Sequence, residues 1–434
     1  MTQRLTPHTE QDRNEHRDRA VLVGVDMGRT DWPIEESLAE LTRLAETADV
    51  DVVGVATQKM DRPHARTFVG SGKVEEIAQL AKDLSANLVI FDDELSPRQQ
   101  LNVEAVLPDT RVIDRTALIL EIFVMHAVTR EGKLQVDLAQ QEYVLPRLRG
   151  MWGHLEKERL GGGRGTRFGA GESQLETDRR LARKRIAELK RELRAVAGER
   201  DLQRKSRARS GVFRVALVGY TNAGKSTLLN ALTGAGVLQA DMLFATLDST
   251  TRRMSLPEGR EITLTDTVGF INKLPHGLVE AFKSTLDEVN EADLQLHVTD
   301  AGSPQREQQM QAVRVVLQEI DAHTVCNVVV FNKCDTLNAD ERASLQRRYP
   351  NAVFVSALDG TDIEVLVARI ADEAARDSIT LTVIIPYTRG DLVALAHERA
   401  QILSERHTEE GTQLALRVSP ELAPAFEGFL LPAV

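Results

Sequence analysis

The stretch FRVALVGYTNAGKSTLLNAL, residues 213–232, decides which fold is expected for this chain. An apolar run leads into Gly219, and the residues from Gly219 to Ser226 match the pattern G-x-x-x-x-G-K-[ST]. In this pattern the glycines let backbone N–H groups close around phosphates, and the helix that follows presents its positive end to them. Lys225 can bridge the terminal phosphates, and the Ser226 hydroxyl can bind Mg²⁺. The stretch therefore predicts a strand, a phosphate-binding loop and a helix.

A second motif, D-x-x-G, lies in ITLTDTVGF, residues 262–270. Asp266 ends an apolar run, where a carboxylate that supports Mg²⁺ belongs, and Gly269 can present its N–H to a γ-phosphate. On its own the motif is weak evidence, because strand-end turns often match it. Its position after a phosphate-binding loop makes the functional interpretation the better one.

A third motif, N-K-x-D, lies in VVVFNKCD, residues 328–335. The Asp335 carboxylate can accept two hydrogen bonds from guanine, which adenine cannot supply, so selectivity of about 10⁴-fold is expected. Lys333 is predicted to pack across the nucleotide and Asn332 to brace the loop. Ser356 and Ala357, after a further strand, are predicted to close over the edge of the base. The expected ligand is therefore GTP.

The segment DMLFATLDSTTRR, residues 241–253, lies between the first two motifs. This is the position expected for a switch region that senses the nucleotide. Such a switch needs a threonine whose hydroxyl reaches Mg²⁺, and Thr246, Thr250 and Thr251 are all chemically possible. The residue after Gly269, where many GTPases have a glutamine that orients water, is Phe270. Slow intrinsic hydrolysis is therefore expected, with stimulation by a partner.

The regions around this core divide the chain into five predicted segments. In order, they are a disordered tail (1–18), an α/β domain (19–131), a helical hairpin with a glycine-rich tip (132–209), a GTP-binding domain (210–376) and a small α/β domain (377–434). The first α/β domain is predicted from apolar runs at 20–26, 51–58 and 87–93, separated by helical stretches at 37–48 and 73–84. The last segment is predicted as a strand at 379–387, a helix at 391–403 and a strand at 412–418.

Two apolar stripes with heptad-like spacing predict the hairpin. The stripes consist of Leu134, Leu138, Leu145, Leu148, Trp152 and Leu155, and then of Ala182, Ile186, Leu189, Leu193 and Val196. Pro146 is expected to kink the first helix. The tip between them, GGGRGTRFGAGE at 161–172, contains Arg164 and Arg167, which can pair with phosphates or stack on RNA bases.

Charge is distributed unevenly along the chain, whose net charge is −11. Residues 178–209 nevertheless contain thirteen Lys and Arg against five Asp and Glu. A basic helix on an acidic protein favours a polyanionic partner, with phosphate contacts along the helix. The two cysteines form no disulfide framework, and neither a signal peptide nor a run of about 18 apolar residues is evident. A cytoplasmic monomer without a membrane span is expected.

One stretch imitates a phosphate loop. VGSGKVEE at 69–76 lacks the first glycine at the right spacing, and Val74 follows Lys73 where the motif needs serine or threonine. It is predicted to be a turn before a helix. The ten histidines form no ligand cluster.

The chain resembles the HflX GTPases, a family related to translation factors. The resemblance covers about residues 20–434 and is most specific in GESQLETDRR, GYTNAGKSTLLNALT, LFATLDSTTRR and DTVGFINKLPHGLVEAFKSTLDEV. It implies a P-loop GTPase domain of α/β class, with a mixed sheet flanked by helices. An α/β domain with a long helical hairpin would precede it, and a small α/β domain would follow.

The resemblance also implies a function. Members bind the large ribosomal subunit and split stalled or idle ribosomes under stress, with the hairpin region reaching toward the peptidyl-transferase centre. The chain departs from the family pattern at two places. Both departures affect the stiffness of the tip and of the switch more than they affect contacts with phosphate or base. GAGES stands at 169–173 where the family usually has G-P-G-E-T, and Ser249 stands where it usually has proline. Some members are reported to bind ATP through the N-terminal region, which the imitation loop at 69–76 supports poorly.

The family pattern selects Thr246 as the Mg²⁺ ligand of the switch and completes the predicted site. The catalytic residues are Lys225, Thr246 and Gly269, and Mg²⁺, the expected cofactor, is bound by Ser226 and Thr246 with Asp266 just outside the direct ligands. Arg164 and Arg167 are predicted to contact ribosomal RNA. The predicted nucleotide contacts are Gly219, Tyr220, Thr221, Asn222, Ala223, Gly224, Lys225, Ser226, Thr227, Phe244, Ala245, Thr246, Leu247, Asp248, Asp266, Thr267, Val268, Gly269, Asn332, Lys333, Cys334, Asp335, Val355, Ser356 and Ala357.

Two other functions remain open at this point. The chain can be a GTP-gated module that stays on a subunit as a hibernation or assembly factor, with incidental hydrolysis. A non-hydrolysable analogue would then support full function. The weaker alternative is ATP-driven remodelling of RNA through the N-terminal domain, which predicts ATPase activity that survives loss of Lys225.

Overall fold

The computed structural model describes ten stretches of the chain: residues 17–28, 32–148, 170–208, 212–234, 243–244, 246–257, 259–275, 283–376, 378–418 and 422–431. The glycine-rich tip with Arg164 and Arg167, residues 1–16 of the predicted tail, and Ala245 lie outside them. The chain forms two compact units. The first comprises residues 1–193, 242–245 and 272–282, and the second comprises 194–241, 246–271 and 283–434.

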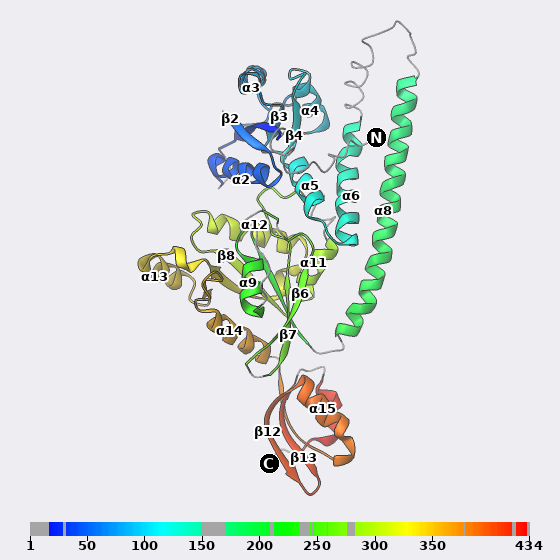
Figure 1. Ribbon diagram of the computed structural model, residues 1–434, viewed down its shortest axis with the longest axis vertical. Helices are drawn as coiled ribbons and strands as arrows, with labels where there is room; N and C mark the ends of the chain where they lie inside the picture. Colours follow the sequence, from blue (N-terminus) through cyan, green and yellow to red (C-terminus); the bar gives the residue numbers. More distant parts are fainter. Residues whose placement is uncertain are drawn as a thin grey trace. The chain divides into compact units, whose positions relative to one another are not determined.

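The first unit contains a four-stranded parallel sheet in the order β2-β1-β3-β4 (Figure 1). Its strands are β1 (Arg19–Asp26), β2 (Asp51–Lys59), β3 (Leu88–Phe91) and β4 (Arg111–Asp114), and its helices are α2 (Ile34–Thr47), α3 (Ser71–Asp83), α4 (Pro97–Glu104) and α5 (Arg115–His126). The three strands and two helices predicted here are confirmed, whereas β4, α4 and α5 were not predicted. The imitation phosphate loop is mostly the start of α3, which begins at Ser71 directly after Gly70, two residues earlier than predicted, and Lys73 pairs with Glu76 at 2.7 Å.

Local signals explain where these helices begin. Ser96 accepts a hydrogen bond from the backbone N–H of Gln99 and forms a capping box at the start of α4. Asp114 caps α5 through the N–H of Ala117, and Thr129 caps the next helix, α6 (Arg130–Val144), through the N–H of Gly132. These caps fix the residues at which the three helices begin.

Helices α6 and α8 (Ala170–Ala208) lie side by side (Figure 1). Arg185 of α8 pairs with Asp137 of α6 at 2.6 Å, and Lys190 pairs with Glu142 at 2.7 Å. The predicted stripe of α8 is its least exposed face, with Leu189 fully buried. Helix α6 ends before Pro146, as expected for proline, and continues as a 3₁₀ turn, η1 (Leu145–Arg147).

The second unit contains a six-stranded mixed sheet in the order β10-β9-β8-β5-β7-β6, with only β6 antiparallel to its neighbour. Its strands are β5 (Phe213–Gly219), β6 (Thr250–Ser255), β7 (Glu261–Asp266), β8 (Leu294–Asp300), β9 (Cys326–Asn332) and β10 (Val353–Phe354). The helices are α9 (Lys225–Thr233), α11 (Lys283–Asn290), α12 (Arg306–Glu319), α13 (Ala339–Arg348) and α14 (Ile363–Arg376), with 3₁₀ turns η2 (Ala322–Thr324) and η3 (Cys334–Thr336). Buried aliphatic residues of β5, β7, β8 and β9 pack against α9 and α14 and form the core.

The C-terminal segment forms an antiparallel sheet in the order β11-β13-β12. Its elements are β11 (Ile379–Ile385), η4 (Tyr387–Arg389), α15 (Gly390–Arg399), β12 (Gln401–Thr408), β13 (Gly411–Val418), η5 (Ala423–Ala425) and η6 (Glu427–Phe429). The prediction of a helix through residue 403 was wrong. Ala400 is extended and Gln401 pairs with Arg417 of β13, so strand pairing overrides the helical pattern at the end of α15. Among the residues that the structure describes, no helix is both long and apolar enough to cross a membrane.

Candidate nucleotide site

The loop between β5 and α9 can be built only with glycine at two positions. A Cβ atom on Gly219 would lie 2.2 Å from the carbonyl oxygen of Val298, because β5 and β8 are neighbours there. Gly224 has φ +88° immediately before α9, and a Cβ on it would lie 2.2 Å from Nδ2 of Asn332. These clashes would push the loop away from its neighbours, so the two glycines of the motif are required by packing as well as by phosphate chemistry.

Lys225, the first residue of α9, lies inside this loop. Its ammonium donates hydrogen bonds to the carbonyl oxygens of Gly219 at 3.1 Å and Tyr220 at 3.0 Å. Burial lowers the pKa of Lys225 to about 8, and Asp266 partly offsets that effect. A buried cation with neutral partners is a favourable place for phosphate oxygens.

Three oxygen-bearing side chains meet beside Lys225. Ser226 Oγ lies 2.6 Å from Oδ2 of Asp266 and 2.8 Å from Oγ1 of Thr246. Oδ1 of Asp266 is buried and has no hydrogen-bond partner among the described residues, and burial raises the pKa of this carboxyl. Two hydroxyls and a carboxylate are ligands that suit Mg²⁺, so the chemistry of this set fits the expected ion.

The other two candidate threonines lie elsewhere. Thr250 and Thr251 are in β6, and the Thr251 hydroxyl forms a hydrogen bond of 3.0 Å with that of Thr265. Of the three candidates, only Thr246 is in contact with Ser226.

The D-x-x-G segment lies directly on the phosphate-binding loop. The Phe270 N–H donates to the carbonyl oxygen of Gly219 at 3.1 Å, and the Thr221 N–H donates to that of Phe270 at 2.7 Å. A Cβ on Gly269 would lie 2.9 Å from Cα of Thr221. The Phe270 side chain is 1% exposed, so it belongs to the core and cannot orient a water molecule.

The residues predicted to recognise the base are connected to the loop by hydrogen bonds. Asn332 donates from Nδ2 to the Ala223 carbonyl oxygen at 3.0 Å and accepts at Oδ1 from the Ala357 N–H at 3.0 Å. Ser356 donates to Oδ1 of Asp335 at 2.7 Å. The structure therefore brings the N-K-x-D and serine–alanine motifs together, with Asn332 bracing the loop.

Asp300 is part of this arrangement and was not singled out from the sequence. It ends β8 opposite Asn332 of β9 and pairs with the Lys333 ammonium at 2.8 Å. The signal was an acidic residue at the end of the apolar run LQLHVTD, the same pattern that identified Asp266. The pair fixes the orientation of the Lys333 side chain.

Several predicted contact residues have buried side chains, so any contact they make with a nucleotide would come from their backbone. Cys334 is buried and its thiol lies 3.1 Å from the carbonyl oxygen of Phe331. Leu247 and Val355 are also buried, and Phe244 belongs to the first compact unit.

Beneath the site, His297 of β8 is a buried histidine with a pH-dependent consequence. Burial, with smaller effects of Arg314 and Lys225, lowers its pKa to about 3. Below pH 6.5 the histidine of the unfolded chain binds a proton that the buried histidine does not. The free energy of unfolding is therefore highest well above pH 6.5 and falls as the pH drops through this value. We expect His297 to contribute a loss whose slope rises from about 0.7 to about 1.4 kcal/mol per pH unit as the pH falls from 6.5 to 5. Urea unfolding of wild type and His297→Leu at pH 7 and 5.5 checks this, and equal pH dependence in both would contradict it.

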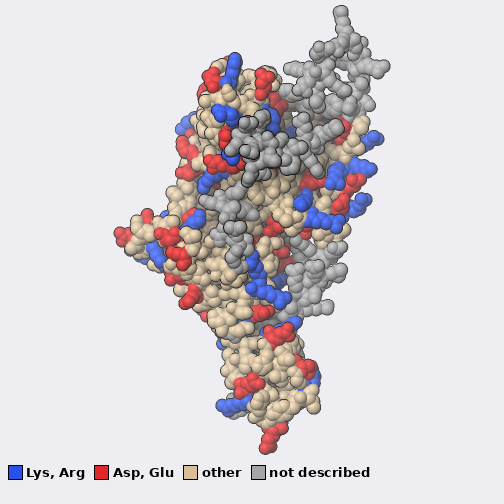
Figure 2. Space-filling view, in the orientation of Figure 1, with Lys and Arg blue, Asp and Glu red and all other residues tan. Residues whose placement is uncertain are grey.

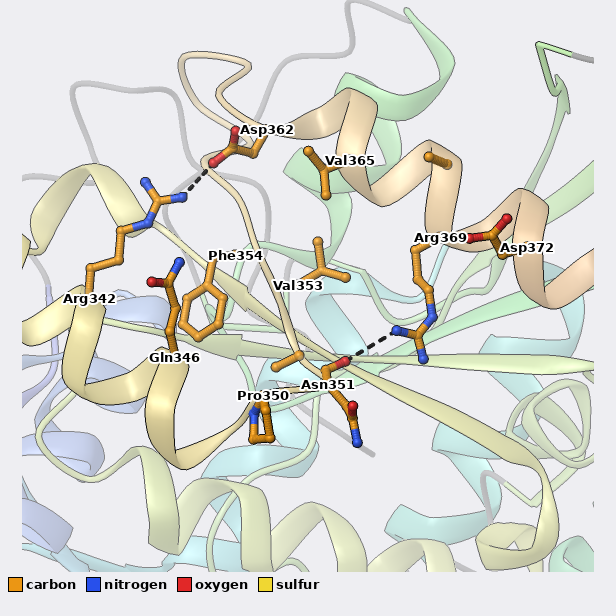
Figure 3. Close-up of a pocket in the computed structure, with 12 residues that line it drawn as sticks. Arg342, Gln346, Pro350, Asn351, Val353, Phe354, Asp362, Val365, Arg369 and Asp372 are labelled. Atoms are coloured by element: carbon orange, nitrogen blue, oxygen red, sulfur yellow. Dashed lines mark hydrogen bonds and ion pairs between the residues drawn. The ribbon is translucent and has the colours of Figure 1, made fainter.

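A hollow of about 470 Å³ lies apart from these motifs, between α13, α14 and the edge strand β10 (Figure 3). Arg342 points to Asp362 at one end, and Arg369 points to the carbonyl oxygen of Asn351 at the other. Both arginines and Asp362 thus have partners within the protein, and none of the nucleotide motifs lines the hollow.

Three family models match successive parts of the chain. Residues 35–124 match a family model described as the N-terminal part of a GTP-binding GTPase, and residues 126–207 match one for its middle region. Residues 214–333 match a model described as 50S ribosome-binding GTPase.

Proteins named GTPase HflX align with nearly the whole chain. Those from Alkalihalophilus pseudofirmus and Escherichia coli are each 44% identical, over 90% and 92% of this chain and 91% and 93% of their own length. The one from Caldanaerobacter subterraneus is 42% identical over 96% of this chain and 94% of its own. The chain belongs to the HflX family of GTPases. Like other HflX proteins, it is a GTP-hydrolysing enzyme with a P-loop GTPase fold.

Proposed function

We propose that this HflX GTPase binds the large ribosomal subunit in the cytoplasm as a monomer and splits or rescues stalled or idle ribosomes under stress. Its intrinsic hydrolysis of GTP is slow and is stimulated by the ribosome. The match to a 50S ribosome-binding GTPase model supports the partner. The observation that carries the proposal is the distribution of charge on α8.

Five cations form an exposed stripe on α8, called here the α8 stripe. At about 100° per residue they fall within an arc about 100° wide, opposite the buried stripe around Leu189, and extend over about 21 Å. The α8 stripe consists of Arg180, Arg183, Lys184, Arg191 and Arg194. Basic side chains gather along α8 in Figure 2. A straight row of cations of this length suits the phosphates of an RNA backbone.

Two cations of α8 outside the α8 stripe pair with α6. Arg185 and Lys190 flank the buried face and pair with Asp137 and Glu142 of α6. In the described part of the chain, Arg180, Arg191 and Arg194 have no ion-pair partner. Arg183 and Lys184 approach Glu176 and Glu188 of the same helix, each at 3.9 Å. The helix thus separates cations that pair with α6 from exposed cations that a polyanion can reach.

The nucleotide site supports a GTP-driven cycle. Lys225 would contact the terminal phosphates, Thr246 and Gly269 would sense the γ-phosphate, and Asp335 would read guanine. Ser226 and Thr246, with Asp266 nearby, would hold Mg²⁺, which when bound offsets charge on the phosphates. Because Phe270 is buried in place of a water-orienting residue, the catalytic group or the ordering of the switch would come from the ribosome. Such a contribution is worth about 10³–10⁵ in rate in other GTPases.

Removing the cations tests the RNA contact. Replacing Arg180, Arg191 and Arg194 by alanine is expected to weaken subunit binding and to lower the slope of log affinity against log salt by about 0.7–0.9 for each phosphate that is no longer bound. Affinity for GTP should not change. The tip variant Arg164→Ala with Arg167→Ala is expected to behave in the same way.

The control for this experiment carries the same charge change elsewhere. Arg43, Arg62 and Arg66 are in the first unit and outside the α8 stripe. Their replacement by alanine should leave the salt slope unaltered. An equal fall in slope for control and α8 variants would show that net charge, and not this surface, governs binding.

The second candidate is a GTP-gated binding module, which the burial of Phe270 favours because hydrolysis could then be incidental. Activity measured with a non-hydrolysable GTP analogue distinguishes the gated module from the hydrolysis-driven cycle. Full activity with the analogue supports the module, whereas loss of multiple-turnover splitting supports the hydrolysis-driven cycle.

A further inference from the structure

The chain that follows Gly269 is anchored by a buried charge cluster. Residues 272–282 belong to the first compact unit, and within it the Lys273 ammonium pairs with Asp92 at 2.5 Å and with Asp93 at 2.6 Å. The two aspartates follow β3 at the carboxyl edge of the parallel sheet. Only three residues separate Lys273 from Gly269, so the anchor acts close to the nucleotide segment.

The cluster depends on Lys273 for charge balance. Asp92 is fully buried, accepts a hydrogen bond from Ser37 at 2.6 Å and pairs with Arg115 at 2.8 Å. Arg115 also pairs with the buried Glu40. Although burial opposes ionisation, Arg115 and Lys273 hold the pKa of Asp92 below its ordinary value. Removing one partner of such a buried pair leaves an uncompensated charge.

The segment before Thr246 has its own anchor in the same unit. Phe244 contacts Phe123 of α5 edge to face, with ring centroids 4.8 Å apart. Its backbone has φ +57°, an unusual conformation for a bulky residue that the packing must sustain. Both segments that carry predicted γ-phosphate contacts are therefore tied to the first unit within four residues of those contacts.

We propose that Lys273 is a positioning residue: its bond to Asp92 and Asp93 is a latch that holds Gly269 where the γ-phosphate is contacted. Gly269 fits closely against Thr221 and Lys225, so the segment that Lys273 anchors already lies against the phosphate-binding loop. The anchor should therefore strengthen, and not weaken, the contact of Gly269 with the γ-phosphate. The latch thus favours GTP over GDP, which lacks the group that Gly269 meets. This inference rests on the proposed role of Gly269.

The coupling is reciprocal. If the latch strengthens GTP binding, GTP must strengthen the latch by the same factor, so binding of GTP should stabilise the ion pairs of Lys273 with Asp92 and Asp93. A substitution that touches no nucleotide atom should then change the preference between GTP and GDP. A coupling of about tenfold is typical for such pairs of sites.

The test uses full-length Lys273→Gln, with Lys273→Arg to restore the charge. The control is Lys59→Gln, because Lys59 is 83% exposed and pairs only loosely, at 3.9 Å, with Asp26 at the same edge of the sheet. Affinities for a non-hydrolysable GTP analogue and for GDP are measured with fluorescent nucleotides. Lys273→Gln should bind the analogue about tenfold more weakly and GDP within about twofold of wild type. Lys273→Arg and Lys59→Gln should resemble wild type.

A second variant shows whether a loss of affinity in Lys273→Gln is caused by misfolding. Asp93→Asn removes one partner of Lys273 and leaves the fully buried Asp92 intact, and it should show a smaller selective loss of analogue affinity. Unchanged analogue affinity in both Lys273→Gln and Asp93→Asn, with normal thermal unfolding, would overturn the latch. Equal loss of analogue and GDP affinity would also overturn it. Failure of the wild-type protein to bind either nucleotide would instead refute the proposed site itself.

Discussion

Asp335→Asn is expected to lower the preference for GTP over ATP by about 10⁴-fold. The carboxylate can accept hydrogen bonds from both guanine donors, whereas an amide offers one acceptor and one donor. Ser356 holds Oδ1 of Asp335 at 2.7 Å, so the side chain is fixed before a base arrives. Competition between labelled GTP and unlabelled ATP, GTP and xanthosine triphosphate measures the effect. The 2-oxo group of xanthine can accept from the new amide, so affinity for this nucleotide should rise.

Asp340→Asn provides the matched control, since Asp340 is an exposed carboxylate at the start of α13. Its replacement should leave the preference for GTP intact. If Asp335→Asn kept its selectivity for guanine, the assignment of the N-K-x-D motif would be wrong.

Lys225→Met is expected to reduce GTP turnover by about 10²–10³-fold. Methionine preserves most of the volume and removes the buried charge that would face the phosphates. Burial lowers the pKa of Lys225 to about 8, which means that the charged form is disfavoured by the fold. Without nucleotide, the variant should therefore unfold at no lower urea concentration than wild type.

Steady-state phosphate release measures GTP turnover, and urea unfolding measures the stability of the fold. Lys133→Met, at an exposed position of α6, should match wild type in each. Normal turnover in Lys225→Met would remove Lys225 from the catalytic residues, and failure of the variant to fold would show that the charge is structural.

Local chemistry made much of the fold predictable. The glycine and lysine pattern at 219–226 requires one backbone geometry, so the strand, loop and helix follow from it. The strands of the first unit were visible because they are continuous apolar runs in a sheet that helices cover. β4 was missed because RVID contains only two apolar residues, and its place depends on pairing with β3. The end of α15 was misplaced because the start of β12 pairs with β13, which no local pattern reveals.

The nucleotide motifs could be recognised because each is a short local pattern in the sequence. Contacts between residues that are far apart in the sequence could not be predicted in this way. Asp300 and Lys333 are far apart in the sequence, and the pairing of β8 with β9 brings them together. Lys273 and Asp92 are 181 positions apart, and each alone is an ordinary charged residue in the sequence. The roles of the predicted site residues, and the division into five segments, remain predictions for experiments to test.

The most direct test of the central claim is GTP turnover at saturating nucleotide with and without purified large ribosomal subunits, using Lys225→Met to exclude contaminating activity. A ribosome-stimulated GTPase predicts a rise of about a hundredfold or more, in which the ribosome supplies what the buried Phe270 does not. An unchanged rate together with tight, GTP-dependent binding to the subunit would contradict it and identify a gated binding module.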